Sequence, residues 1–145
     1  MRKELTNIHE AKFEAATNRR GQQWWQLDLS GEHLGVRIEV LAPGGHSSYH
    51  HFHTVEEEHV LALEGTATLV RGTEAITVRA GDHVWFPAGK EEPHHIENRS
   101  TKNFKFLVFG ERSQADVVVY PDHGVMLVKA LDRKQITYDE RTKLS

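Results

Sequence analysis

Residues 44–65, GGHSSYHHFHTVEEEHVLALEG, constrain the fold of this chain most, because they place histidines and carboxylates at the spacing of a strand, a turn and a second strand. Side chains alternate between the faces of a strand, so His51 and His53 point the same way with backbones roughly 6 to 7 Å apart. The acidic run 56–58 predicts a turn, after which HVLALEG returns antiparallel to the first strand. If the two strands pair as a hairpin, Glu58 reaches the side of His51 and His53. The pattern predicts a metal site with two nitrogen donors and one oxygen donor.

The spacing of these residues resembles the first motif of the cupin family. In this chain the motif consists of Gly45, five residues, His51-x-His53, four residues, Glu58, six residues and Gly65. Only Glu58 lies six residues before Gly65, so the resemblance implies Glu58 as the carboxylate ligand. The neighbouring Glu57 stays open as an alternative ligand.

The segment GDHVWFPAGKEEPHHIEN resembles the second motif of the same family. It supplies Gly81, five residues, Pro87-x-Gly89, a histidine, three residues and Asn98. Four residues separate Gly89 from the histidine, where the common form has two, and this longer turn is similar to a subgroup of small bacterial cupins. Only His94 keeps the three-residue spacing to Asn98. The resemblance therefore implies His94, and not the adjacent His95, as the fourth ligand.

Several other histidines are interpreted as surface residues. His50 has the opposite strand parity to His51 and His53, and His46 follows a PGG turn. The same interpretation is given to His59, His83 and His95. Asn98 and the motif glycines are interpreted as scaffold, since turns at strand ends often need a positive φ.

The rest of the chain reads as short strands separated by turn residues. GVRIEVLAPGG alternates apolar and charged residues as a half-buried strand does, ATLVRGTEAITV predicts a hairpin, and NFKFLVFGE places two phenylalanines on one face. This pattern predicts an all-β, antiparallel sandwich or barrel, and the cupin resemblance narrows it to a jelly-roll barrel, the double-stranded β-helix. We expect a single domain over 1–145, with a motif core at 45–98, an irregular or helical N-terminal arm at 1–22 and C-terminal strands at 116–138. The barrel is nearly complete by residue 109, so the C-terminal strands look surplus and are expected to extend a sheet edge or pair across a dimer.

Composition excludes several classes of partner. The formal net charge of −3 and the pI near 6.4 give no electrostatic reason to expect a nucleic-acid partner, which would favour a basic face. The chain has no cysteine, so a metal must be held by nitrogen and oxygen donors. The first twenty residues lack the apolar run of a signal peptide, and no stretch of 18 apolar residues occurs. We expect no membrane partner and a cytoplasmic protein.

Two adjacent tryptophans, Trp24 and Trp25, cannot both face one core if their segment is extended. Large aromatic residues are enriched where a partner subunit covers them. One tryptophan is therefore expected in the core and the other at a subunit contact, which favours a homodimer.

The predicted ligands leave open coordination positions on a divalent ion that prefers five or six ligands. Two histidines and a carboxylate on one face also resemble the oxygenase facial triad, so iron(II) is our first prediction, with manganese, nickel, zinc and copper as alternatives. The resemblance implies a metal-dependent enzyme, a dioxygenase or an isomerase or lyase, acting on a small oxygen-rich or aromatic metabolite. The alternative is a non-catalytic cupin that binds or senses a small molecule or metal and acts through a partner protein. Tyr49 shares the strand parity of His51 and His53 and is predicted as a catalytic residue.

Overall fold

The computed structural model describes residues 4–17 and 23–139, which form antiparallel strands and two short 3-10 turns. The strands are β1 (Glu14–Thr17), β2 (Gln23–Asp28), β3 (Leu34–Leu41), β4 (Phe52–His53), β5 (Glu58–Glu64), β6 (Thr66–Arg71), β7 (Glu74–Arg79), β8 (His83–Phe86), β9 (His94–Glu97), β10 (Phe104–Glu111), β11 (Val117–Tyr120), β12 (Val125–Val128) and β13 (Lys134–Thr137). The 3-10 turns are η1 (Pro121–His123) and η2 (Lys129–Leu131).

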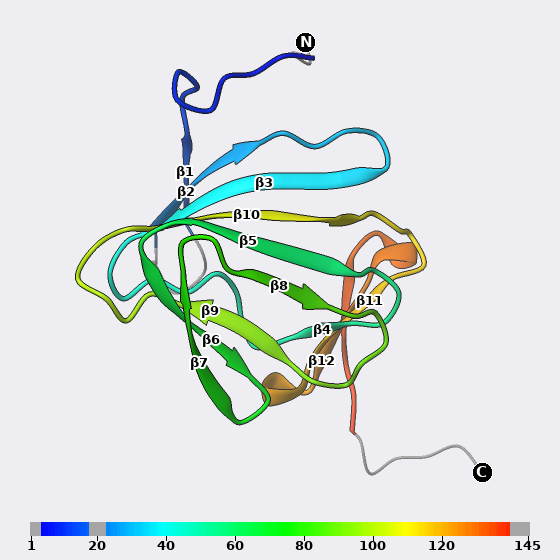
Figure 1. Cartoon of the computed structure of the whole chain (residues 1–145). Coiled ribbons are helices and arrows are strands. Elements are labelled where there is room, and N and C mark those ends of the chain that lie inside the picture. The colour runs from blue at the N-terminus through cyan, green and yellow to red at the C-terminus, as the bar shows by residue number, and fades with distance from the viewer. Residues whose placement is uncertain (1–3, 18–22, 140–145) are drawn as a thin grey trace.

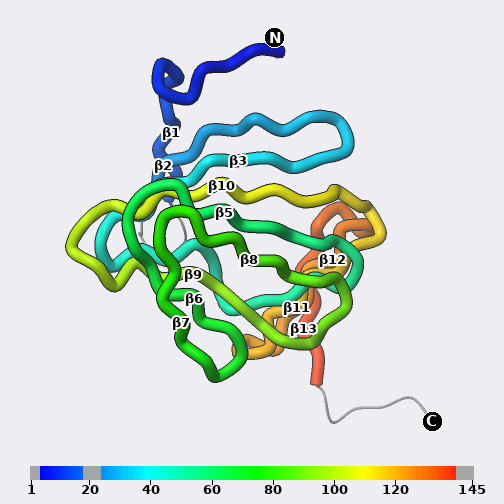
Figure 2. The backbone as a smooth tube through the Cα atoms, viewed as in Figure 1, coloured from blue at the N-terminus to red at the C-terminus, as the bar shows by residue number. Residues whose placement is uncertain are grey.

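Three antiparallel sheets make up the fold (Figure 1). The largest has the order β1-β2-β3-β10-β5-β8, and the smaller sheets have the orders β13-β12-β11-β4 and β7-β6-β9. The backbone trace in Figure 2 shows β10 lying between β3 and β5, with β6, β7 and β9 below them. The predicted all-β jelly-roll barrel is confirmed.

Apolar side chains from the large sheet and the β6–β7–β9 sheet form the core. Phe104 and Phe106, two positions apart on β10, both point inward and stack with their ring centroids 5.2 Å apart. Further buried core members are Leu41, Val60, Ala62, Ala67, Leu69, Val78, Phe86 and Ile96. The predicted hairpin within ATLVRGTEAITV is β6–β7, whose last pair is Arg71 and Glu74.

The motif residues interpreted as scaffold hold turns between strands. Asn98 is fully buried, and its Nδ2 donates to the carbonyl oxygens of Leu41 and Lys102 at 2.8 and 2.7 Å. Gly65 has a φ of 82°, and a Cβ there would lie 2.5 Å from the carbonyl oxygen of Asn103. Gly45 is an exception to the expectation of a positive φ, because Gly44 takes that conformation with a φ of 83°.

The expected hairpin between the two halves of the first motif does not form. His53 of β4 pairs with Val118 of β11, whereas β5 pairs with β10 and β8. His51 and Glu58 therefore approach each other through closure of the barrel and not through local pairing. The acidic residues 56 and 57 form the connection, and Glu58 begins β5.

The strand β3 turns its charged face toward the interior. Arg37 and Glu39 line an internal cavity, while Ile38 faces the other side of the sheet. The sequence pattern identified this strand as half-buried, but the charged face is the one that lines the cavity. Burial of Glu39, which is 5% exposed, places a carboxyl group inside the barrel.

The C-terminal strands are an integral part of the barrel and are not surplus. β11 pairs with β4 through Val118 and Val119, and β12 and β13 continue the same sheet. This sheet places Asp116 and Tyr120 beside the histidines of the first motif. The expectation that the barrel is nearly complete by residue 109 is therefore wrong.

The N-terminal arm contains no helix in its described part. Residues 4–13 are irregular, and β1 follows them and pairs with β2. Residues 1–3 and 18–22 of the predicted arm lie outside the described residues. Across the described ranges, no helix has the length and apolar character needed to span a membrane.

Candidate metal centre

Four side chains implied by the two motifs converge inside the barrel. The Nε2 atoms of His53 and His94 lie 3.8 and 3.7 Å from the two carboxylate oxygens of Glu58. The ring centroid of His51 lies 5.1 Å from that of His53 and 4.8 Å from that of His94. Donor atoms of His51, His53 and Glu58 lie within 4.8 Å of one another. The geometry suits one divalent ion shared by imidazole and carboxylate donors.

Main-chain hydrogen bonds fix two of the histidines opposite each other. The amide of His51 donates to the carbonyl of His94 at 3.2 Å, and the amide of His94 donates back at 2.9 Å. The amide of Gly89, which begins the longer turn before β9, donates to the carbonyl of His53 at 2.9 Å. The unusual turn of the second motif is therefore attached directly to the strand that carries the first motif.

The hydrogen bonds of the Nδ1 atoms determine which ring nitrogen of His51 and His53 is available to a metal. The Nδ1 of His51 lies 2.8 Å from the carbonyl oxygen of Tyr49, which can only accept. The Nδ1 of His53 lies 2.7 Å from Oδ2 of Asp116. With a proton on each Nδ1, both Nε2 atoms are free to bind a metal.

Asp116 is a fully buried carboxylate that sequence reasoning did not identify. Its Oδ1 accepts the amides of Val55 and Glu56 at 3.0 and 3.3 Å. Burial alone would raise the pKa of Asp116, but the hydrogen bond from His53 and these amides outweigh it and hold the pKa well below its usual range. Asp116 therefore stays ionised and orients His53.

Electrostatics keep two of the proposed ligands in the form that binds a metal. Burial, followed by the neighbouring charge of His94, lowers the pKa of His51 to about 4. Burial would raise the pKa of Glu58, but His94 and the other histidines outweigh it and lower the pKa to about 2. At neutral pH, His51 is a neutral donor and Glu58 a carboxylate.

The environment of His94 tests whether these residues fit a metal. Its Nε2 is buried and has no hydrogen-bond partner among the described residues. Phe86 stacks on the ring at a centroid distance of 3.6 Å and an interplanar angle of 8°, which holds the ring in place. Buried polar atoms are rarely left without a hydrogen-bond partner, so this nitrogen fits the residue set of a metal site.

The alternative carboxylates are engaged elsewhere. Glu57 is exposed and accepts a hydrogen bond from the indole Nε1 of Trp85 at 3.1 Å. Glu56 is buried, and both its oxygens accept from Nζ of Lys129 at 2.6 and 2.7 Å. Since Lys129 occupies both oxygens of Glu56 and its Nζ lies 3.6 Å from Asp116, Glu56 offers no free oxygen, and we do not assign a cation to the group of His53, Glu56 and Asp116.

Tyr49 does not line the cavity, whereas Tyr120 does. The Tyr49 ring packs edge-on against His123, with the centroids 4.7 Å apart, and against Tyr120 at 6.4 Å. The ring of Tyr120 lies 5.8 Å from that of His51. Burial raises the pKa of Tyr120, so its hydroxyl stays protonated. A catalytic role for Tyr49 stays a prediction, and Tyr120 is the tyrosine that the C-terminal sheet brings to the histidines.

The cavity over the four side chains has a volume of about 340 Å³. It combines the histidine cluster with charged groups from the walls and the mouth. The connection before β5 contributes Glu56 and Glu57, and the other charged lining residues are Arg37, Glu39, Glu111, Arg112, Lys129 and Arg133. None of these other residues belongs to the two motifs, so the sequence offered no signal for them beyond charge on a predicted strand.

The histidines predicted to lie at the surface fall into two groups. His59 and His83 stack on the outer face of the large sheet, with Nδ1 of His59 and Nε2 of His83 2.9 Å apart. His46, His50 and His95 are only partly exposed and gather against β9. The surface interpretation therefore missed a second concentration of imidazoles.

Comparison with known proteins agrees with this geometry. Residues 37–110 match the family model described as a cupin domain. The chain is a cupin. A solved structure from Acidithiobacillus ferrooxidans, named "Putative sugar phosphate isomerase", is 30% identical to this cupin, covers 83% of it and 80% of its own chain, and has a TM-score of 0.76.

Two further structures share the fold. A sugar phosphate isomerase of the cupin superfamily from Silicibacter pomeroyi is 32% identical, with 71% of this cupin and 68% of that chain covered and a TM-score of 0.68. A "predicted oxalate decarboxylase" from Thermotoga maritima is 22% identical, with 75% of this cupin and 99% of that chain covered and a TM-score of 0.65. This similarity supports the fold alone. No curated protein matches the sequence.

Proposed function

We propose that this cupin is a metal-dependent isomerase that acts on a small phosphorylated sugar. The observation that carries the proposal is the content of one cavity, which combines a metal-type donor set, a buried carboxyl group outside that set and arginines. The names of the two relatives at 30% and 32% identity support the same reaction class. Of the activities implied by the family resemblance, isomerisation uses all three features of the cavity.

His51, His53, Glu58 and His94 are the residues that would hold the metal. Bound there, a divalent ion would supply a Lewis acid that polarises a substrate carbonyl. Iron(II) remains our first prediction, followed by manganese, nickel, zinc and copper, because nitrogen and oxygen donors accept all of them. Asp116 keeps the His53 ring oriented for this role.

Glu39 is assigned the proton transfer between neighbouring substrate carbons. Its carboxyl lines the cavity, and burial raises its pKa despite the opposing effect of Arg37, whose Nε donates to Oε1 at 3.1 Å. A raised pKa suits a group that must take a proton from one carbon and return it to the next. Tyr120, with its hydroxyl protonated, is assigned to donate a hydrogen bond to a substrate oxygen.

Arg112 and Arg133 are assigned to the phosphate group. Both line the cavity and have exposed side chains, and a guanidinium matches phosphate oxygens in a paired geometry. Arg133 has a φ of 58° directly after Asp132 with a φ of 54°, two consecutive non-glycine residues in the left-handed region. Such backbone is costly, and it is more often kept at functional sites than elsewhere.

The proposal is tested by assaying purified protein, loaded with each candidate metal, against phosphorylated aldoses and ketoses. Glu39→Gln should abolish turnover while metal content is unchanged, and Glu64→Gln, an exposed residue at the end of β5, should leave turnover intact. Arg133→Ala should raise KM for phosphorylated sugars and leave binding of unphosphorylated sugars unchanged.

Two outcomes would contradict the isomerase. Oxygen consumption with a metabolite would favour the dioxygenase alternative. Saturable ligand binding without turnover would favour the sensing alternative, in which the cupin acts through a partner protein. Fractionation of the native host tests the predicted cytoplasmic location.

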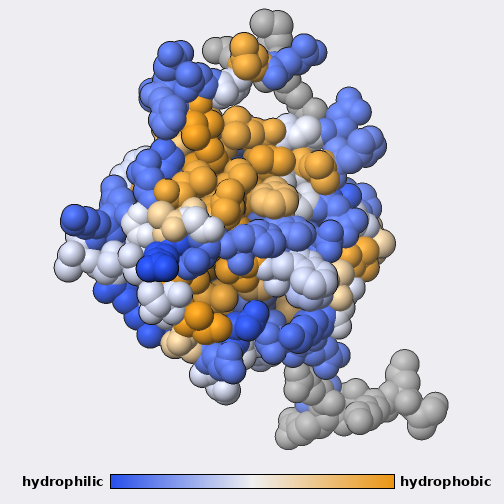
Figure 3. All heavy atoms as spheres, viewed as in Figure 1, coloured by the Kyte–Doolittle hydropathy of each residue, from blue (hydrophilic) through white to orange (hydrophobic). Residues whose placement is uncertain are grey.

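We also propose a homodimer formed through the outer face of the large sheet. Trp24 packs against the core, whereas Trp25 lies on the opposite face beside its pairing partner Val40. Figure 3 shows hydrophobic atoms gathered on this side of the molecule beneath the N-terminal segment. The partly exposed apolar residues of this face are Trp25, Leu27, Val36, Val40, Leu61, Leu107 and Phe109. A continuous apolar face that is left partly exposed often marks a site of contact with a partner.

A further inference from the structure

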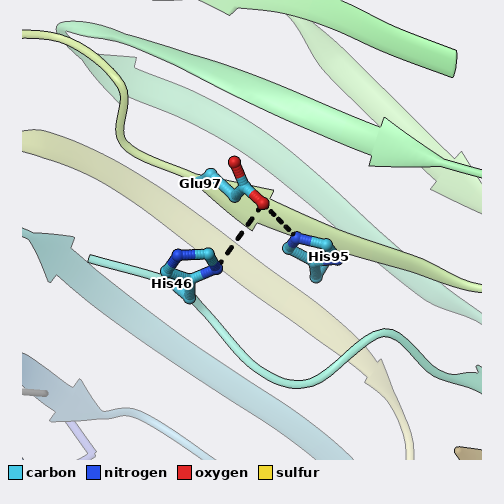
Figure 4. Close-up of side chains that lie close together, drawn as sticks. All are labelled: His46, His95 and Glu97. Atoms are coloured by element: carbon cyan, nitrogen blue, oxygen red, sulfur yellow. Dashed lines mark hydrogen bonds and ion pairs between the residues drawn. The ribbon is translucent and has the colours of Figure 1, made fainter. Parts of the chain in front are cut away.

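We propose that His46, His95 and Glu97 form a second divalent-cation site, distinct from the centre inside the barrel. Figure 4 shows the three side chains directed toward one another, two from β9 and one from the segment that precedes β4. The inference does not depend on the isomerase assignment, because it concerns residues that this assignment does not use.

Strand alternation places this cluster on the other side of β9 from the first centre. His94 and Ile96 are buried on the inner face, so His95 and Glu97 point to the outer face. His46 reaches them from the neighbouring segment through a β-bridge to Glu97. The two clusters therefore alternate along one pair of chain segments, and His95 also borders the cavity of the first centre.

Two imidazole nitrogens converge on a single carboxylate oxygen. The Nε2 of His95 lies 2.7 Å from Oε1 of Glu97, and the Nδ1 of His46 lies 3.6 Å from the same oxygen. The three donor atoms lie within 4.8 Å of one another, and the rings of His46 and His95 are stacked at a centroid distance of 5.6 Å. Metal–ligand bonds of about 2.0–2.2 Å need only small shifts from these positions.

The surrounding contacts fix the carboxylate and the backbone. The Nε of Arg99 donates to Oε2 of Glu97 at 2.7 Å, which leaves Oε1 for the two imidazoles. The amide of Ser47 donates to the carbonyl of Ile96 at 2.9 Å, and the amide of Asn98 donates to the carbonyl of Gly45 at 2.9 Å. Donors held by a rigid backbone lose little entropy when they bind a cation.

Two imidazole nitrogens beside this cluster lack a hydrogen-bond partner. The Nδ1 of His95 and the Nε2 of His50 are buried and have no hydrogen-bond partner among the described residues. The rings of His50 and His95 meet edge-on at a centroid distance of 5.0 Å. Imidazole nitrogens without hydrogen-bond partners are unusual in a protein interior, and the ring contact makes His50 a third imidazole bordering the site.

The donor set determines the kind of cation. Two or three imidazoles with one carboxylate favour zinc, nickel or copper over calcium or magnesium, which prefer oxygen ligands. A cation here would join the segment that carries His51 to the strand that carries His94. We assign it a structural role, which is to keep the two halves of the first centre in register.

The test is a zinc titration of the full-length, metal-free protein by calorimetry, with bound zinc counted by elemental analysis. The parent should bind two equivalents of zinc. His46→Ala and Glu97→Gln should each bind one, whereas His33→Ala, which removes an exposed histidine of the β2–β3 turn, should still bind two. A parent that binds one equivalent, or a His46→Ala variant that still binds two, would overturn the proposal.

A thermal measurement separates a structural cation from one without effect on the fold. In His94→Ala, in which the first centre lacks a ligand, zinc should still raise the melting temperature. The increase should disappear in His94→Ala/His46→Ala and persist in His94→Ala/His33→Ala. An equal increase in all three variants would refute the assignment to His46.

Discussion

His53 donates its Nδ1 proton to Asp116, a residue 63 positions later in the chain, across a distance of 2.7 Å. This contact joins the first motif to the start of the C-terminal sheet. It also fixes the tautomer in which Nε2 of His53 faces Glu58. A metal centre in this cupin is therefore supported from outside the two motifs.

Asp116→Asn is expected to weaken metal binding without removing a ligand. The amide accepts a hydrogen bond less strongly than the carboxylate, so the orientation and basicity of His53 both suffer, and affinity should fall about 10–100-fold. Competition with a chromogenic chelator measures the change. Asp82→Asn, in the exposed turn before β8, serves as the control, and equal affinities in the two variants would contradict the role of Asp116.

Loss of His94 should abolish metal binding at the proposed centre inside the barrel. The Nε2 of His94 is buried and has no hydrogen-bond partner among the described residues, which fits the proposed role as a ligand. His94→Ala is expected to bind one equivalent less than the parent in elemental analysis. His83→Ala, which alters the imidazole pair on the outer face, should keep the parent value. Full metal content in His94→Ala would show that the ligand set is wrong.

In the metal-free protein, His51 and His53 are expected to titrate on opposite sides of pH 6.5. Burial lowers the pKa of His51 to about 4. Burial also opposes protonation of His53, but the hydrogen bond to Asp116 and the charge of Glu58 outweigh it and raise its pKa. Imidazole resonances followed by NMR over a pH series measure both values. A His51 that titrates near 6.5 would contradict its burial.

These pKa shifts also give the pH dependence of folding. An unfolded chain protonates His51 near pH 6.5 and the folded chain only near 4, so the stability due to neutral His51 is complete above 6.5 and declines between 6.5 and 4. The raised pKa of His53 acts in the opposite direction, with stability present below 6.5 and lost as the pH rises through its folded value. His51→Gln should therefore lose less stability than the parent on acidification from 6.5 to 4, as measured by urea unfolding of metal-free protein.

The four side chains that converge inside the barrel could be predicted from sequence because both motifs fix their own spacing. Parity on a strand put His51 and His53 on one face, and the distance to Asn98 distinguished His94 from His95. The route by which they meet could not be predicted. A local hairpin was the simplest pairing for residues 51–64, but the barrel pairs β4 with β11 and β5 with β10.

Residues outside the motifs were missed because charge on a strand normally indicates solvent. Arg37 and Glu39 alternate with Val36, Ile38 and Val40, and the pattern alone does not distinguish a water-filled cavity from bulk water. Asp116 was missed for a different reason. Its contact with His53 depends on the pairing of two strands that lie far apart in the sequence. Long-range contacts of this kind have no local signature.

The two adjacent tryptophans are expected to respond differently to substitution. Trp25→Ser removes an aromatic ring from the apolar outer face and should shift the protein from dimer to monomer in light scattering, with little change in monomer stability. Trp24→Ser removes a ring packed against the core and should lower the melting temperature. If Trp25→Ser leaves the mass unchanged, the proposed interface is wrong.

Lys129 is expected to stabilise the barrel by neutralising buried carboxylates. Its Nζ contacts both oxygens of Glu56 at 2.6 and 2.7 Å and lies 3.6 Å from Asp116, and all three side chains are largely buried. Removing one member of a buried ion pair leaves a charge without compensation, so Lys129→Met should lower the free energy of unfolding by about 3–5 kcal/mol. Lys134→Met, at an exposed position of β13, is the control. In urea unfolding, Lys129→Met/Glu56→Gln should recover much of the lost free energy of unfolding, because the double variant removes the charge that Lys129 balances. Additive losses would mean that the two side chains act independently.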